Sequence, residues 1–133
     1  MNYEVLYKTL KIKLEALIPN AVVRLPNELP ADDTDLDIDV SISEVDSNIY
    51  TEKSMKRDIS IDLSLSVPIS TGTQRIHHIA SRIVAAFDPL HKGNFWTDGH
   101  GWFIRIRSAG QRQPNMTKTC YQINVRIMAT IDT

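Results

Sequence analysis

The stretch from Asp58 to Val67 constrains the fold more than any other part of the chain. A period of two places alternate side chains on opposite faces of an extended backbone. The apolar set is Ile59, Ile61, Leu63, Leu65 and Val67, and the polar set is Asp58, Ser60, Asp62, Ser64 and Ser66. The sequence therefore predicts a strand with one buried and one wet face, and a slip of one residue would turn the whole core face to water.

A helix is predicted directly after this strand. Pro68 has no amide proton for a ladder, and Thr71 and Gln74 have the spacing of a capping box. Apolar residues then recur at steps of three and four, at Ile76, Ile79, Ala80, Ile83, Val84 and Phe87. This stripe predicts a helix with one face on the core, ended by Asp88 and Pro89.

The same periodicities predict the other elements. Residues 2–18 carry a helical stripe, and strands are expected at 21–25, 36–43, 102–107 and 119–131, with 44–56 as a connection between antiparallel strands. The order α-β-β-β-α-β-β predicts an α+β sandwich, with both helices on one face of a four- to five-stranded mixed, mostly antiparallel sheet. A right-handed crossover through the second helix would pair the central strand in parallel with the strand at Trp102.

Length and composition fit a single domain over residues 1–133. Cys120 is the only cysteine, which excludes an internal disulfide and a cysteine-cluster zinc site. The longest purely apolar run, Ile83 to Phe87, is far too short to cross a bilayer, and Glu4 argues against a signal peptide. We expect a soluble protein with no membrane partner.

Charge is divided unevenly between the two halves of the chain. Residues 1–67 hold thirteen acidic against seven basic residues, a net charge of −6, and residues 68–133 hold three against eight, a net charge of +5. One interpretation is that copies pack head to tail, with an acidic face on a basic one. The other is that the strands merely sort this way within one subunit.

Two clusters raise the possibility of metal or acid–base chemistry. Asp35, Asp37 and Asp39 lie about 7 Å apart along one strand face, too far to share an ion without other elements. His91, Asp98 and His100 lie in the glycine-rich segment 90–101, but no HExxH, Walker or nucleophile-elbow pattern supports them. We interpret the aspartates as a solvated strand face, and the segment as a loop that folds Phe95 and Trp96 onto the domain edge or a partner.

The two C-terminal strands and their connection are basic. Their charged side chains are Arg105, Arg107, Arg112, Lys118 and Arg126. Such a hairpin could bind a phosphate backbone. However, the net charge of the chain is not positive, and Phe103 is the only aromatic residue placed among the basic ones. The nucleic-acid signal is therefore weak.

The order of elements and three local features resemble a known family. The features are the extended VVRLPNELP segment after the first helix, the strand that ends at a proline, and the helix GTQRIHHIASRIVAAF, opened by glycine and closed by phenylalanine. Together they resemble the lambda-like tail terminator proteins of long-tailed bacteriophages, a minor tail protein family. The resemblance spans the chain.

The resemblance implies a structural role without enzymatic activity, catalytic residues, metal or cofactor. It implies a subunit of a homohexameric ring in the virion tail, assembled in the host cytoplasm. The ring would cap the tube of major tail protein, stop its polymerisation, join the head–tail connector, and let genomic DNA pass through its lumen without specific binding. Two alternatives remain: a neck or head-completion connector of the same virion, and a small metal-dependent enzyme that uses Asp98 and His100.

Within such a ring, the charge division suggests which residues meet neighbours. The candidates for a subunit interface or for the lumen are Asp35, Asp37, Asp39, Asp58, Asp62, Arg105, Arg107 and Arg126. Opposite charges on the two sides of a subunit would fix the register of a heterologous contact. Carboxylates in the lumen would instead repel the DNA backbone and let it slide.

Overall fold

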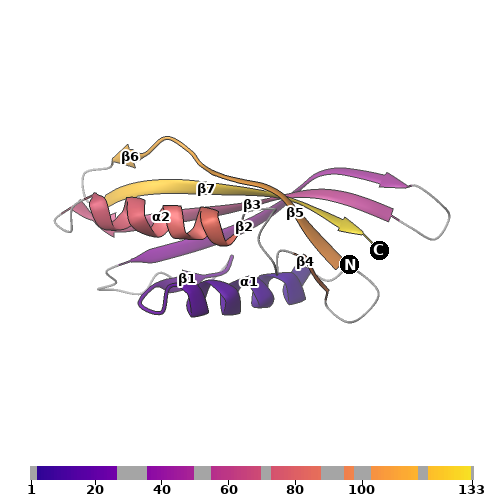
Figure 1. Cartoon of the computed structure of the whole chain (residues 1–133), viewed down its shortest axis with the longest axis horizontal. Coiled ribbons are helices and arrows are strands. Elements are labelled where there is room, and N and C mark those ends of the chain that lie inside the picture. The colour runs from indigo at the N-terminus through magenta and orange to yellow at the C-terminus, as the bar shows by residue number, and fades with distance from the viewer. Residues whose placement is uncertain are drawn as a thin grey trace.

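A computed structural model describes residues 3–26, 36–49, 55–69, 73–87, 95–97, 103–116 and 120–132 (Figure 1). These ranges form helices α1 (Tyr3–Leu17) and α2 (Gln74–Ala86), and strands β1 (Val22–Arg24), β2 (Asp37–Ile49), β3 (Met55–Pro68), β4 (Phe95–Thr97), β5 (Phe103–Gln111), β6 (Asn115–Met116) and β7 (Cys120–Asp132). The predicted α+β class and the order of the main elements are confirmed. The short strands β4 and β6 are additions to that order.

The strands form one twisted sheet in the order β1-β2-β3-β7-β5-β4, with β6 beside β7. All pairs are antiparallel except the parallel pair of β1 and β2. The predicted parallel pair of β3 and β5 is wrong, because β7 lies between them. The thirteen residues of β7 match almost the whole of β3, which has fourteen, whereas β5 has only nine.

The hairpin of β2 and β3 is longer than the sequence suggested. Both strands run through most of the segment interpreted as a connection, which leaves only residues 50–54 outside them. The register shifts at a bulge between Glu44 and Asp46, and pairing resumes there. Figure 1 shows the hairpin extending beyond both helices as an arm. β7 accompanies β3 in this arm as far as Lys56, which pairs with Asp132. Residues 44–49 and 55–57 do not alternate between apolar and polar side chains, so periodicity could not predict these strand ends.

Both helices pack on one face of the sheet and form the core with it. Leu6, Leu10 and Leu14 of α1 are fully buried, as are Ile61 and Leu63 at the centre of β3. The predicted register of β3 is therefore correct. The helical stripe of α2 is also confirmed, since its buried residues are Ile76, Ile79, Ala80 and Ile83.

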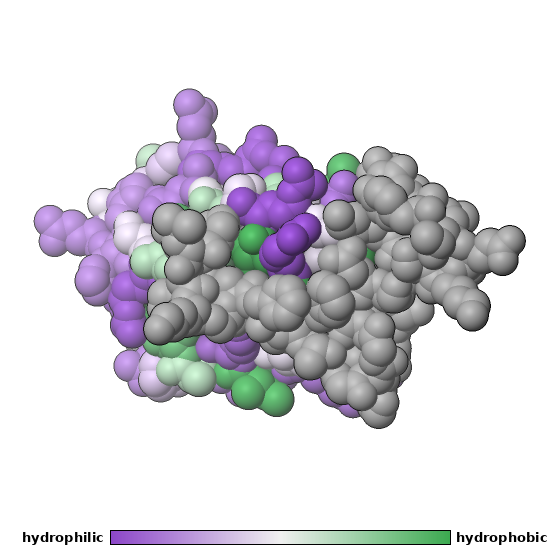
Figure 2. All heavy atoms as spheres, turned by 45° about the vertical axis from the view of Figure 1, so that its right-hand side comes forward, coloured by the Kyte–Doolittle hydropathy of each residue, from purple (hydrophilic) through white to green (hydrophobic). Residues whose placement is uncertain are grey.

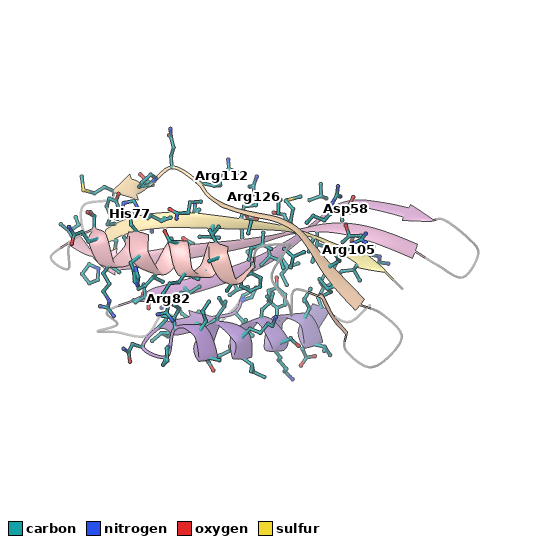
Figure 3. The ribbon with its side chains drawn as sticks, viewed as in Figure 1. Asp58, His77, Arg82, Arg105, Arg112 and Arg126 are labelled. Carbon is teal, nitrogen blue, oxygen red and sulfur yellow. The ribbon has the colours of Figure 1, made fainter. Side chains whose placement is uncertain are left out.

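Two side chains of α2 make polar contacts with other elements. Arg82 donates from Nη2 to the carbonyl oxygen of Leu17 at 3.1 Å and so bridges the two helices (Figure 3). His77 Nε2 lies 3.2 Å from the hydroxyl of Tyr121 on β7. The predicted capping box is wrong, because Gln74 is itself the first helical residue; the N-cap is Thr73, and its side chain makes no capping bond. Neither helix among the described residues is long and apolar enough to cross a membrane.

Candidate interaction surface

The sheet face opposite the helices, which we call the polar face, carries the predicted site residues that the structure describes. Its side chains come from four neighbouring strands. They are Asp37, Asp39, Ser41 and Ser43 of β2; Asp58, Ser60, Asp62, Ser64 and Ser66 of β3; Gln122, Asn124, Arg126, Met128 and Thr130 of β7; and Arg105 and Arg107 of β5. Asp35, also predicted, lies outside the described residues.

Two ion pairs join the acidic strand β3 to the basic strands. Arg126 Nε donates to Asp62 Oδ1 at 2.9 Å, directly across the β3–β7 ladder. Arg107 Nη1 reaches Asp58 Oδ1 at 3.3 Å, and the buried hydroxyl of Thr130 donates to the same oxygen at 2.8 Å. The structure thus brings the oppositely charged candidates together within one subunit. Whether any of them also meets a neighbour stays a prediction.

The aspartates of β2 are held by an arginine that sequence reasoning missed. Arg24 of β1 lies 2.7 Å from Asp37 Oδ2 and 3.2 Å from Asp39 Oδ1. The parallel pairing of β1 with β2 places Arg24 there, because Val22 and Arg24 align with Asp37 and Asp39. These two carboxylates therefore serve an ion pair, while Arg24 Nη1 and Asp37 Oδ1 are buried and make no hydrogen bond among the described residues.

Two arginines near the β5 edge remain exposed. Arg105 and Arg112 have no ion-pair partner among the described residues (Figure 3). The backbone N–H of Arg112 donates to Asn124 at 2.8 Å, which fixes its position after β5. Arg107 and Arg126 are held by carboxylates, so the positive charge of the basic hairpin, whose nucleic-acid signal was weak in the sequence, is partly neutralised. Lys118, like His91, Asp98 and His100, lies outside the described residues.

Side chains of α1 tie the base of the β2–β3 arm to the body. The hydroxyl of Tyr7 accepts a hydrogen bond from the backbone N–H of Ile42 at 3.0 Å. The hydroxyl of Tyr3 donates to Glu44 at 3.4 Å, and Arg57 lies 3.7 Å from the same carboxylate. Burial, and then the charge of Glu44, raise the pKa of Tyr3. Both tyrosines lie within the helical stripe predicted over residues 2–18, and the stripe did not predict these hydrogen bonds.

Exposed apolar side chains are scattered over the surface. Among the residues that the structure describes, the large ones are Ile12, Val22, Val45, Ile69 and Met116, each from a different segment. Figure 2 shows that the described surface on this side is mainly hydrophilic, with hydrophobic atoms gathered at the lower margin. Single exposed apolar residues are ordinary on soluble domains and do not by themselves mark an interface.

Comparison with known proteins finds a likeness of fold. No family model matches the chain, and no curated protein matches it. One solved structure, which carries no functional description, superposes with a TM-score of 0.71 over 98% of this chain and 96% of its own, at 15% identity. A chain of the virion of a native gene transfer agent particle superposes with a TM-score of 0.51, at 13% identity, over 90% of this chain and 84% of that chain. The arrangement of elements thus recurs in proteins of very different sequence.

Proposed function

We propose that this chain is a structural protein of a phage-like virion. The observation that carries the proposal is the likeness of fold to a virion chain of the gene transfer agent particle, over 90% of this chain. The finer role rests on the resemblance of the VVRLPNELP and GTQRIHHIASRIVAAF segments to tail terminators. In that role the chain forms a ring, caps the tail tube, stops its polymerisation and offers the surface to which the head connector joins.

The chemistry of the polar face supports a structural role over a catalytic one. Asp58 and Asp62 accept hydrogen bonds from neighbouring strands, and Asp37 and Asp39 are held by Arg24. Carboxylates held in ion pairs and hydrogen bonds of this kind are poorly placed to move protons. Arginines that are paired with these carboxylates are poorly placed to bind phosphates. This agrees with a ring through which DNA passes without specific binding.

The experiment is deletion of the gene from the phage that carries it, followed by electron microscopy of the lysate. A tail terminator is needed to stop polymerisation, so we expect tails of excess and variable length that carry no heads. A plasmid copy of the intact gene should restore tails of uniform length, and a copy with an early stop codon should not. Tails of normal length that fail to join heads would contradict the terminator role and indicate the neck or head-completion connector instead.

The segment with His91, Asp98 and His100 gives a separate prediction. Replacing each with Ala should leave metal content and any turnover unchanged, because the proposed role needs neither. Metal content is measured by mass spectrometry of protein purified without chelators. A stoichiometric transition metal that disappears in the variants would contradict the structural role and favour the metal-dependent enzyme.

A further inference from the structure

Both edges of the sheet are only partly covered by the described strands. β1 accompanies β2 as far as Asp39, and β4 accompanies β5 only over Phe103–Arg105. Beyond those points neither edge has a strand partner among the described residues. The free stretches lie at the same level of the sheet, since one rung crosses from edge to edge through Ser41, Asp62, Arg126 and Gly110.

Backbone groups on both free stretches point away from the sheet. Arg112 donates its N–H toward β7, so by alternation the N–H and C=O of Gln111 and Ala109 face outward. On β2, the bond from Val22 N–H to the carbonyl of Leu36 shows that even-numbered residues face the β1 side. Ile42 is one of them, and its N–H is capped by Tyr7, which leaves its C=O and the groups of Glu44 at the edge. Such edges are templates for another strand.

The two edges complement each other in direction and charge. β2, β3, β7 and β5 alternate in direction, so β2 and β5 run antiparallel to one another. On its free stretch the β2 edge carries the exposed carboxylate of Glu44, and beside the free stretch of β5 lies the exposed Arg112. If a second copy continued the sheet, its β2 would lie antiparallel to β5, and a net acidic edge would meet a net basic one. Two copies of the same edge would instead bring like charges together.

Gly110 on the β5 edge has no local explanation. Its φ lies outside the left-handed region, and a Cβ built there would meet no atom within 4 Å. Glycine destabilises a strand relative to Ala, and in a strand it often marks a close approach of another backbone. Gly110 lies within the free stretch, so a neighbouring strand is the feature that would use it.

We propose that the free edge of β5 in one copy pairs with the free edge of β2 in the next, so that the sheet continues from subunit to subunit. The inference deepens the proposed function and rests on its claim that the chain assembles with itself. The two edges differ, so the contact is heterologous: every subunit uses both, and repetition closes a ring or grows a filament. The cap from Tyr7 places the start of the new ladder after the N–H of Ile42, toward the β2–β3 arm.

Disulfide crosslinking tests the pairing. In a Cys120→Ser background, the variants are Ser41→Cys with Gly110→Cys, and Ser43→Cys with Gly110→Cys. All three positions are exposed on the polar face, and a register shift of two residues keeps that face, so the two variants cover adjacent registers. Within one chain the positions are three strand spacings apart, about 14 Å, which a disulfide cannot span. Any bond between them therefore joins two subunits.

The expected result is a ladder of crosslinked trimers and higher multimers from at least one double variant under mild oxidation. Each single-cysteine variant should stop at dimers. A control that combines Gly110→Cys with Ile12→Cys, on the outer side of α1, should form no ladder. On assembly, the amides of Ala109 and Gln111 should also change from fast to slow hydrogen exchange.

Two other results separate the failure of this inference from that of the proposed function. If sedimentation shows assembly, but neither double variant gives a ladder and the two amides stay fast, the edge pairing is refuted while self-assembly stands. If the chain is a monomer at every concentration and salt tested, even with tail tube protein present, then both self-assembly and the edge pairing are refuted.

Discussion

A double-mutant cycle on Asp62 and Arg126 tests whether the charge division of the sequence is used inside the subunit. The variants are Asp62→Ala, Arg126→Ala and the pair together. Their side chains form the 2.9 Å bond across the β3–β7 ladder, with 36% and 46% of their surfaces exposed. If the division serves the subunit itself, the free energies of unfolding of these variants should show coupling.

The magnitude follows from exposure and from one buried neighbour. A pair this exposed is screened by water, so we expect a coupling of about 0.5–1 kcal/mol. Asp62 also accepts a hydrogen bond from the hydroxyl of Ser60, which is only 5% exposed. Losing an acceptor for a buried group costs about 1–3 kcal/mol. Asp62→Ala should therefore destabilise more than Arg126→Ala, by about 1 kcal/mol.

The assay is urea unfolding, at a protein concentration where sedimentation shows a single species. The coupling should shrink in about 0.5 M salt, because partly exposed charges are screened. Asp62→Asn is the matched control, since it keeps an oxygen for Ser60 but removes the charge. No coupling at low salt, together with equal effects of the two single variants, would refute the intrachain explanation and return the charge division to contacts between subunits.

Three further predictions concern the body of the subunit. Leu63→Ala, at a fully buried position, should lower the free energy of unfolding by about 2–5 kcal/mol. Ile12→Ala, at a position that is 67% exposed, should change it by less than about 0.5 kcal/mol. Urea unfolding measures both free energies. Tyr7→Phe should leave the N–H of Ile42 without its acceptor and speed its hydrogen exchange, and an unchanged rate would show that the cap is not formed in solution. Since the pKa of Tyr3 is raised, the folded state holds the phenol proton more tightly than the unfolded state. The resulting stability is present below pH 10.0 and is lost as pH rises through the folded pKa. Tyr3→Phe should remove this part of the loss of stability at alkaline pH, as measured by urea unfolding.

The core and the helices could be predicted because their signals are local. The alternation of apolar and polar residues over Asp58–Val67 predicted which face of β3 is buried. The recurrence of apolar residues at steps of three and four predicted the buried stripe of α2. In both cases burial of apolar area dominates the free energy, so periodicity and structure agree. The same reasoning placed Asp62 and Arg126 on the solvent-facing sides of their strands, and both side chains are partly exposed there.

The strand order and the polar contacts could not be predicted, because they depend on partners distant in sequence. No local pattern says that β7 lies between β3 and β5, and without that order the neighbour of Asp62 is unknown. In the sequence Arg24 is one residue of a short strand, and no pattern marks it. It comes to lie beside Asp37 and Asp39 only because β1 pairs in parallel with β2. The outer part of the β2–β3 hairpin was not predicted, because residues 44–49 and 55–57 do not alternate between apolar and polar side chains.

The strand order also explains why charge remains at the edges. β1, β2 and β3 come from the acidic half of the chain, and β7, β5 and β4 from the basic half, so the linear division becomes a gradient across the sheet. At the seam of β3 and β7 the opposite charges meet and neutralise each other. The excess charge lies at the outer strands. At one edge the single Arg24 faces two carboxylates, which leaves a negative excess. At the other edge Arg105 and Arg112 have no ion-pair partner among the described residues, which leaves a positive excess. A gradient of this kind cannot be cancelled within one subunit, but a second copy placed edge to edge in the same orientation would cancel it.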